Sequence, residues 1–326
     1  MRIVRVAAVA AAALWMSAVA VCAEGFPERQ ITIVVAAPAG GPTDTFGRII
    51  AESLGKTFNQ RVLVENVVGA GGLVGSRHVA SSAPDGYTLL LYNTALTSLP
   101  AFLKAAKDFD PSTALTPIGL INEAPFVLVS RVDFPSSGPG DLIARLRDDP
   151  ASIRMGHGGF GGGAHICGLL LARALKAQPN FVAYRGAAAV MTDILGGHID
   201  LFCAQTADAI NNINSKSVKG FWVTGPARLN QLADLPTIAE AGISGADISA
   251  WHGLFAPAGT PAETVKVINS ALAKTLQDPA VLSRFESLGA TPVAVDRRSP
   301  EALGKHVKAE LARWKDLVAE LSVEQE

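Results

Sequence analysis

Glycine-rich loops, each lying between a predicted strand and a predicted helix, are the feature that most constrains the fold of this chain. They occupy residues 38–44, 69–72 and 156–163. Each loop follows a short β-rich run and precedes residues with helical periodicity. A chain that alternates strands and helices in this way is expected to form α/β layers around a largely parallel sheet.

Further strands are predicted along both halves of the chain. They are residues 31–37, 61–64, 87–92, 152–155, 181–184, 199–203 and 220–224. Two helical faces separate strand pairs, one formed by Phe46, Ile49, Ile50 and Leu54 and the other by Ile166, Leu169, Leu170 and Ala174. The order strand, helix, strand therefore recurs in both halves.

Helix starts are clearest in the last third of the chain. Residues 260–263 combine an N-cap threonine, a proline at the first helical position and a capping-box glutamate. Asp278 and Ser299, each followed by a proline, predict the starts of two more helices. Gly289 predicts the end of the helix that begins at Asp278. These are structural signals without a functional role.

A glycine loop between a strand and a helix suits anion binding. Glycine allows close approach to the backbone, free N–H groups point outward, and the helix dipole adds partial positive charge. The chain carries a formal net charge of −1. Since no overall positive charge attracts an anion, these local donors are expected to bind it.

Enzyme and cofactor motifs are mostly missing. Gly156, Gly158 and Gly161 spell the dinucleotide motif G-x-G-x-x-G, but the acid expected about 20 residues later is absent, since the first is Asp193. There is no P-loop, no G-x-S-x-G elbow and no H-E-x-x-H. The six histidines are scattered without metal-ligand spacing. We expect no cofactor, no metal and no enzymatic activity.

Residues 1–23 have the pattern of a secretory signal peptide. A basic start with Arg2 and Arg5 precedes an apolar run over 6–21, and residues 21–23 fit signal-peptidase cleavage. The apolar run is shorter than the about 20 residues that a membrane span needs. We expect a soluble, periplasmic protein with enough residues for two domains.

Charge and cysteine content limit the partners. Removal of two arginines changes the formal net charge from −1 to −3, and no basic run remains. No nucleic-acid partner is therefore expected. Cys167 and Cys203 remain after cleavage. An exported protein allows a disulfide between them, and two buried thiols are the alternative.

An ordered series of motifs resembles the Bug family, the substrate-binding proteins of tripartite tricarboxylate transporters. The motifs are residues 38–44 (P-x-G-G-x-T-D), 65–66 (EN), 69–72 (GAGG), 83–90 (APDGYTLL), 184–186 (YRG), 195–200 (LGG to Asp200), 235–242 (LPTIAEAG) and 251–261 (WHGLFAPAGTP). They cover nearly the whole chain after the signal peptide.

The resemblance implies a type II periplasmic-binding-protein fold, with two α/β lobes joined by crossing strands around a ligand cleft. Lobe one would comprise residues 24–124 and 251–326, and lobe two residues 125–250. The crossings are expected at 124–126 and near 250–251. Such a protein captures a small carboxylate, is usually a monomer, and delivers its ligand to the membrane subunits of the transporter.

The resemblance also implies the ligand-binding residues. In lobe one they are Ala39, Gly40, Gly41, Thr43, Asp44, Asn93 and Thr94. In lobe two they are His157, Gly158, Gly161, Gly162, Gly163, His165, Gln205 and Thr206, with Arg185 as a charged contact or a solvated surface residue. Backbone amides and the Thr43 hydroxyl would bind one carboxylate. Asp44 is favoured for capping the helix or holding the loop, because an acid repels an anion.

Departures from the family leave the identity of the ligand open. His157 and Gly162 replace residues that are often serine or threonine in the family. Residues 203–208 resemble a subgroup pattern, but Ala204 replaces its acid and Asp208 replaces its amide. In that subgroup two cysteines placed like Cys167 and Cys203 are paired, which implies a disulfide here. A ligand-presenting partner of a membrane receptor kinase is an alternative function. An exported hydrolase using Thr43, His157 and Asp44 is another.

Overall fold

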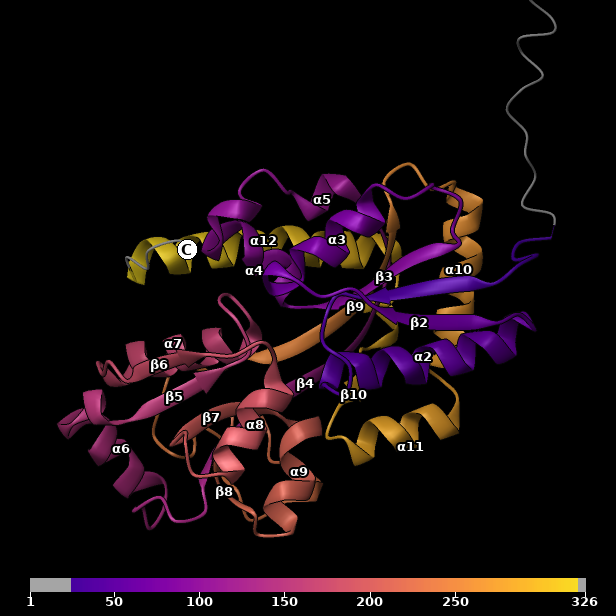
Figure 1. The fold of residues 1–326 in the computed structure, drawn as a ribbon. Coiled ribbons are helices and arrows are strands. Elements are labelled where there is room, and N and C mark those ends of the chain that lie inside the picture. Colours follow the sequence, from indigo (N-terminus) through magenta and orange to yellow (C-terminus); the bar gives the residue numbers. More distant parts are fainter. Residues whose placement is uncertain (1–24, 322–326) are drawn as a thin grey trace, which may run out of the picture.

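The structure is a computed structural model that describes residues 25–321. The predicted signal peptide, residues 1–23, lies outside the described residues. Two mixed β-sheets with helices on their faces form the upper and lower halves of the molecule (Figure 1). Among residues 25–321, no helix is both long and apolar enough to span a bilayer.

The first sheet has the strand order β2-β1-β3-β9-β4, and β10 pairs with β4. Its strands are β1 (Ile31–Val35), β2 (Val62–Asn66), β3 (Thr88–Asn93), β4 (Leu115–Arg131), β9 (Ser249–Pro257) and β10 (Thr291–Pro292). The helical elements around it are α2 (Pro42–Phe58), η1 (Ala70–Gly72), α3 (Leu73–Ala80), α4 (Ala95–Phe102), η2 (Lys104–Ala106), α5 (Pro111–Ala114), α10 (Ala262–Thr275), α11 (Pro279–Ser287), η5 (Val295–Arg297) and α12 (Pro300–Leu321). β1 runs parallel to β2 and β3, whereas β9 is antiparallel to β3 and β4.

The second sheet continues from β4 in the order β4-β7-β5-β6, and β8 also pairs with β4. Its other strands are β5 (Arg154–His157), β6 (Asn180–Ala183), β7 (Leu201–Gln205) and β8 (Val218–Val223). The helical elements around it are α6 (Pro139–Asp148), η3 (Pro150–Ser152), α7 (Gly163–Leu175), α8 (Ala187–Leu195), α9 (Thr206–Asn214) and η4 (Asn230–Leu232). β5 is parallel to β6 and β7.

Strand β4 belongs to both sheets. Over residues 115–125 it pairs with β9 of the first sheet, and over 126–131 it pairs with β7 and β8 of the second. The change of partners falls between Pro125 and Phe126, and β9 begins opposite it at Ser249. Proline has no N–H for a ladder hydrogen bond, so this is a suitable place for the change of partners.

Side-chain alternation along the strands creates a core on each face of each sheet. In β1, Ile33 and Val35 pack with α2, α10 and α11, whereas Val34 packs with α3, α4 and α12. In β4, Val127 packs with α8 and α9, whereas Leu128 packs with α6 and α7. Both sheets are therefore covered on two sides, as expected for α/β layers.

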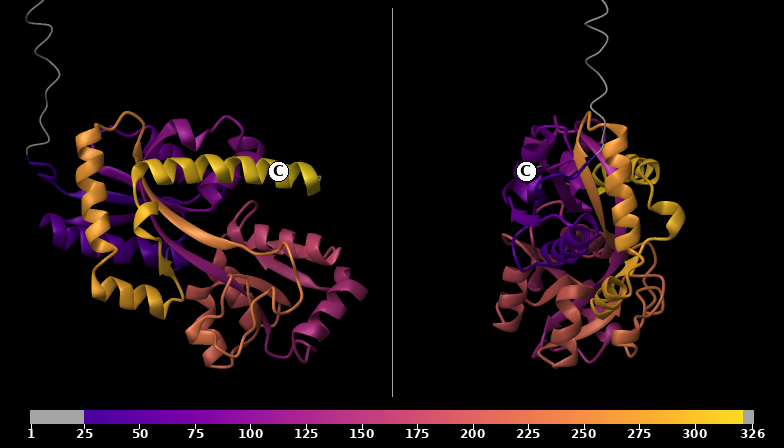
Figure 2. Two further views of the ribbon diagram at one scale, coloured as in Figure 1. Left: turned by 180° about the vertical axis from the view of Figure 1, so that it is seen from behind. Right: turned by 90° about the vertical axis from the view of Figure 1, so that its right-hand side faces the viewer.

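Helix α12 contacts both halves of the molecule (Figure 2). Leu303 and Val307 lie in a core of the first sheet, while Trp314 and Leu317 lie in a core of the second. Trp314 also donates its Nε1–H to the Thr97 hydroxyl of α4 at 3.1 Å. The last turns of the described chain thus pack against residues that the sequence predicted to form lobe two.

The predicted elements are all present, and the ends of the predicted strands differ from the observed ones by at most two residues. Asp278 caps α11 by accepting from the Ala280 N–H, and Gly289 follows that helix with φ +64°. The prediction of a capping box that starts at Thr260 is wrong. α10 begins at Ala262 after Pro261, and the Thr260 hydroxyl donates to the Pro257 carbonyl instead. The Thr260 hydroxyl therefore stabilises the turn after β9 instead of capping α10.

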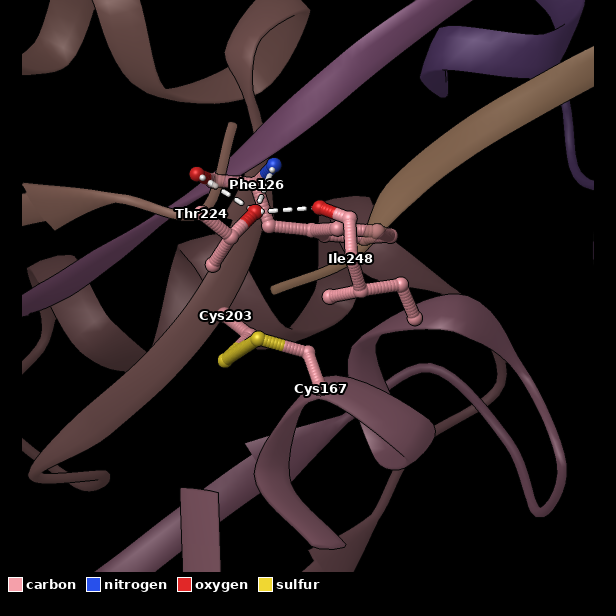
Figure 3. Close-up of a disulfide and its surroundings, with 5 residues drawn as sticks. All are labelled: Phe126, Cys167, Cys203, Thr224 and Ile248. Atoms are coloured by element: carbon pink, nitrogen blue, oxygen red, sulfur yellow. Dashed lines mark hydrogen bonds between the residues drawn. A yellow bond between two sulfur atoms is a disulfide. The ribbon is translucent and has the colours of Figure 1, made fainter. Parts of the chain in front are cut away.

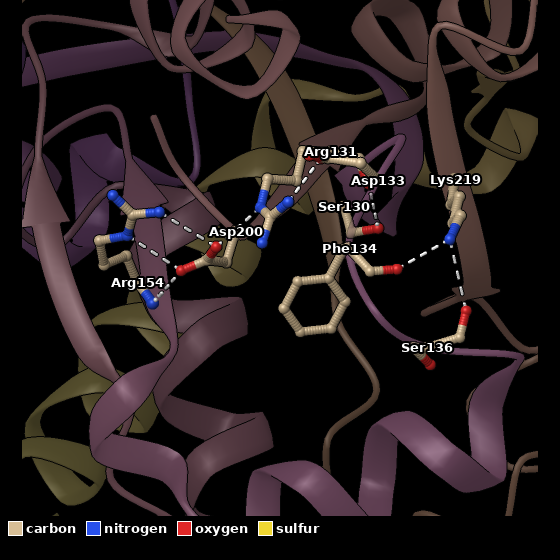
Figure 4. Close-up of polar contacts among 8 residues, drawn as sticks. All are labelled: Ser130, Arg131, Asp133, Phe134, Ser136, Arg154, Asp200 and Lys219. Carbon is tan, nitrogen blue, oxygen red and sulfur yellow. Dashed lines mark hydrogen bonds and ion pairs between the residues drawn. The ribbon is translucent and has the colours of Figure 1, made fainter. Parts of the chain in front are cut away.

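A buried carboxylate, Asp200, joins three strands at the end of the second sheet away from the loop ends of β5 and β7 (Figure 4). It accepts from Arg131 Nε at 2.9 Å, from the Arg154 backbone N–H at 2.9 Å and from Arg154 Nε at 3.0 Å. Burial raises the pKa of Asp200, but these hydrogen bonds, led by those from Arg154, outweigh the effect of burial and hold the pKa below the usual value of an aspartate. The ionised form therefore stabilises the fold.

We predict that Asp200→Asn lowers the free energy of unfolding by about 2 kcal/mol near neutral pH, because charge-assisted hydrogen bonds from two partly exposed arginines are lost. A depressed carboxyl pKa contributes stability above the unfolded-state value, and that contribution falls as the pH drops below it. The difference from wild type should therefore narrow below about pH 4 in urea titrations.

Asp133→Asn is the matched control, since Asp133 is exposed and pairs with the same arginine, Arg131. The free energy of unfolding of Asp133→Asn should remain close to that of wild type. Equal stability of wild type and Asp200→Asn at neutral pH contradicts the prediction, as does a difference that stays constant into acid.

Candidate functional site

A cleft of about 660 Å³ lies between the two sheets, at the carboxyl ends of their parallel strands. The segments that follow β1 and β2, with the end of β3, line one side, and the segments that follow β5 and β6, with the end of β7, line the other. Crevices outside the carboxyl ends of strands are the usual ligand sites of open α/β sheets. The volume lies within the range of small-molecule sites.

Four helix N-termini open into this cleft. The N-cap residues of α2, α7, α8 and α9 all line it, namely Gly41, Gly162, Gly186 and Gln205. No side chain makes a capping hydrogen bond at any of these four ends. By contrast, aspartates cap α5 and α11 elsewhere. The first N–H groups of a helix have no intrahelical partner, so the cleft presents several amides to a ligand.

The charge of the cleft is positive. Among the described residues that line it, Arg185 is the one charged side chain, and none is acidic. Helix N-termini each add a partial positive charge. The site therefore favours an anion, and its large apolar lining accommodates a small organic body.

Asp44 organises the first loop from behind. Its carboxylate accepts from the Gly40 N–H, Asn66 Nδ2 and Arg48 Nε, each at 2.9 Å. Burial raises its pKa, but the hydrogen bonds from Arg48, Gly40 and Asn66 outweigh it, so the pKa lies below the usual range. Gly41 is the N-cap, so the capping role for Asp44 is wrong, whereas the loop-holding role is seen.

Thr43 and Asn93 form the polar floor on the side of the first sheet. Asn93 Nδ2 donates to Thr43 Oγ1 at 2.8 Å, and Thr43 Oγ1 lies 3.3 Å from His252 Nε2. Both residues line the cleft, as the sequence predicted. Thr94 does not reach it, because its hydroxyl accepts from the Trp251 backbone N–H and is buried.

The two predicted histidines lie behind the third glycine loop rather than in the cleft. The rings of His157 and His165 stack at a centroid distance of 4.3 Å, and Phe102, Phe160 and Phe181 surround them. β5 extends to His157, so its side chain turns into the core and the loop begins only at Gly158. These two imidazoles, predicted as ligand contacts, do not line the cleft.

The remaining predicted residues divide between the cleft and its supports. Those that line the cleft are Gly41, Thr43, Asn93, Gly158, Gly162, Gly163, Arg185 and Gln205. Those that do not are Ala39, Gly40, Asp44, Thr94, His157, Gly161, His165 and Thr206. Gly161 donates to His165 Nδ1 and accepts from Ser98, and the Thr206 hydroxyl donates to the Gly289 carbonyl across the two halves.

Sequence reasoning missed several lining residues. Phe160 and Tyr184 form aromatic walls, and Phe126 and Phe202 close the cleft from the strands. The loop at 69–72 also lines it and was recognised as glycine-rich without being assigned to the site. Its position between a strand and a helix was the available signal. Aromatic residues in strands carry no comparable signal, since most serve the core.

A disulfide joins Cys167 in α7 to Cys203 in β7 beside the cleft (Figure 3). Cys203 lines the cleft, and Cys167 follows the third glycine loop by one helical turn. Nearby, the Thr224 hydroxyl links the Phe126 N–H to the Ile248 carbonyl, and thus the two crossing segments. The implied pairing is therefore present. No group of three or more potential metal ligands occurs among residues 25–321.

The fold and the site define a two-lobed solute-binding protein. The chain belongs to the tripartite tricarboxylate transporter receptor family, whose model matches residues 46–323. This result confirms the predicted family and, because its members are binding proteins, the prediction that the chain is not an enzyme.

Relatives and solved structures agree with this membership. The chain is 40% identical over 302 residues, 93% of the chain and 87% of the relative, to a UPF0065 protein from the TAR-I ttuE-ttuC′ intergenic region of Agrobacterium vitis. The structure of the periplasmic binding protein BugD is 36% identical, with a TM-score of 0.87 over 92% of this chain and 100% of that one. The malate-bound MatC of Rhodopseudomonas palustris is 34% identical, with a TM-score of 0.84 over 90% and 100%. The periplasmic-binding-protein fold is thereby confirmed.

We predict that reduction of the Cys167–Cys203 disulfide destabilises the protein. The sequence separation of 36 corresponds to about 4 kcal/mol in the chain-entropy model. Thermal unfolding of the protein without residues 1–23 should shift to lower temperature with a reductant. The Cys167→Ala, Cys203→Ala double variant should not respond to the reductant. Two reactive thiols in denatured, unreduced protein would rule the disulfide out.

Acid should destabilise the fold through His165. Burial lowers the pKa of this histidine to about 3, well below that of a solvent-exposed imidazole. Because the unfolded chain then binds a proton more readily, stability is lost as the pH falls from the unfolded pKa towards the folded one.

Relative to wild type, His165→Asn keeps an acceptor for the Gly161 N–H without titrating. Between pH 7.5 and pH 5, the free energy of unfolding of wild type should fall by about 2 kcal/mol more than that of the variant. Urea titrations at both pH values measure this change. A difference independent of pH contradicts the prediction.

Proposed function

We propose that the protein is an exported solute-binding protein that captures a small carboxylate in the cleft between its two sheets. The observation that carries the proposal is the convergence of four uncapped helix N-termini on a cleft without acidic lining residues. Such ends supply backbone donors and a favourable potential for an anion. Arg185 adds a full positive charge at the same cleft.

The ligands of relatives support a carboxylate. The MatC structure contains malate, and a second Rhodopseudomonas palustris protein, 28% identical with a TM-score of 0.87, contains adipate. These ligands differ in length and substitution, so they indicate the chemical class and leave the particular acid open. The mixed lining of backbone amides and aromatic side chains in the present cleft fits the same class.

We also propose that ligand binding closes two lobes about the crossing strands. In this proposal lobe one is residues 24–124 with 251–326, and lobe two is residues 125–250. The change of β4 partners between Pro125 and Phe126 supports a hinge at that point. Contact of α12 with both cores supports a bending axis beside this helix rather than free rotation of the lobes.

Delivery of the ligand to the membrane subunits of a tripartite tricarboxylate transporter follows from the family membership. Export through a cleaved segment at residues 1–23 and action as a periplasmic monomer complete the proposal. The pattern of that segment supports export. No observation favours the alternative sensor role over transport.

The proposal predicts a thermal shift with one or more acids of a carboxylate panel. A ligand at one hundred times its Kd stabilises the folded state by about 2.7 kcal/mol. Arg185→Gln should weaken binding by roughly tenfold, because a charge-assisted contact is lost.

Arg147→Gln is the matched control, since Arg147 is exposed on α6 and does not line the cleft. Its affinity should equal that of wild type. A panel without any shift, repeated by calorimetry, would contradict the carboxylate site, and equal losses in both variants would contradict the role of Arg185.

A further inference from the structure

A buried chain of four polar side chains connects the crossing strands to the cleft. Asn122 in β4 and His252 in β9 face each other in register, with Asn122 Oδ1 at 2.8 Å from His252 Nδ1. The other ring nitrogen of His252 lies 3.3 Å from Thr43 Oγ1, which accepts from Asn93 Nδ2 at 2.8 Å. Asn122 and His252 are 0% exposed.

The direction of each hydrogen bond follows from the donors and acceptors. A carbonyl oxygen only accepts, so His252 Nδ1 carries the hydrogen and donates to Asn122 Oδ1. Burial lowers the pKa of His252 to about 3, so the ring is neutral and its Nε2 has a lone pair. The Thr43 hydroxyl therefore donates its hydrogen to His252 Nε2.

This assignment leaves Thr43 with an acceptor and no donor for a ligand. One lone pair of Oγ1 is taken by Asn93 and the other remains. Asn93 has the opposite character. Its Oδ1 accepts from the Ala95 N–H, one Nδ2 hydrogen goes to Thr43, and the second Nδ2 hydrogen is left for a ligand. The cleft thus presents a donor beside an acceptor.

We propose that His252, oriented by Asn122, is a positioning residue that makes the cleft selective for 2-hydroxy carboxylates. This inference rests on the proposed function and names its substrate class. The ligand carboxylate accepts from Asn93 and the backbone amides of α2, while the adjacent hydroxyl donates to Thr43 Oγ1. A ligand without that hydroxyl leaves the Thr43 lone pair unpaired in a closed site, which costs affinity.

A 2-amino acid also offers a donor next to its carboxylate, but the surroundings oppose it. An ammonium group would lie among four helix N-termini and Arg185, with no acidic residue in the described lining. Asp44 follows Thr43 in the sequence, but its carboxylate already accepts hydrogen bonds from Arg48, Asn66 and the Gly40 N–H. The geometry therefore favours a neutral donor over a cationic one.

Calorimetry with malate, aspartate and succinate tests the selectivity, because these acids differ only in the hydroxyl, ammonium or hydrogen at one carbon. Lactate, alanine and propionate repeat the comparison on a shorter skeleton. We expect the hydroxy acid to bind at least about tenfold more tightly than the other two in whichever set binds. Thr43→Val should remove this preference, and Thr43→Ser should retain it.

His252→Phe separates positioning from a purely structural role. We expect it to reduce the ratio of hydroxy-acid to unsubstituted-acid affinity towards one, whereas a structural defect lowers both affinities alike. Nitrogen-15 NMR of ligand-free protein labelled at histidine, assigned with the same variant, should show the neutral Nδ1–H form of His252. If that variant does not fold, Asn122→Leu serves for the assignment and the affinity ratio.

The outcomes distinguish this inference from the proposed function. An Nε2–H form of His252 overturns the positioning role whether or not any ligand binds. Binding of other carboxylates without preference for a 2-hydroxy acid, or a preference for aspartate or alanine, overturns the selectivity and leaves the proposed function intact. Failure of every acid to bind overturns the proposed function and the named substrate class together.

Discussion

One shared strand organises this molecule. Because β4 pairs with β9 up to Pro125 and with β7 and β8 from Phe126, the two sheets are parts of one hydrogen-bonded ladder rather than separate domains on a flexible linker. The helices that cover each sheet are placed by that ladder. The carboxyl ends of both sets of parallel strands then face one another, and the cleft is the space between them.

The affinity of the cleft for an anion depends on two absences among the described residues that line it, namely side-chain caps on its helices and acidic side chains. Four helices begin at its wall without side-chain caps, and acidic residues near it are engaged elsewhere, as Asp44 is by Arg48. Exposed amides at a helix end are satisfied by solvent in the free protein and by an anion in the complex. Glycine at three of the four caps allows a ligand to approach the backbone closely.

Support behind the cleft comes from the interior of both halves. The disulfide ties α7 to β7, and the stacked pair of His157 and His165 fills the space under the third glycine loop. On the other side, Asn122 and His252 connect the crossing strands to Thr43. Residues that resemble ligand contacts in the sequence thus often hold the loops that make the contacts.

The sequence by itself determined the order of strands and helices, the glycine loops and the family, because these depend on local periodicity and ordered motifs. Thr43, Asn93 and Arg185, which it predicted as ligand contacts, line the cleft: Asn93 ends β3, Arg185 closely follows β6, and Thr43 lies in the first turn of α2 after the first glycine loop. Only the tertiary structure decided that His157 and Thr94 turn inward, that Thr260 serves a turn rather than a helix, and that α12 packs on both cores. Those outcomes depend on which side chain faces a distant partner, and no local pattern carries that information.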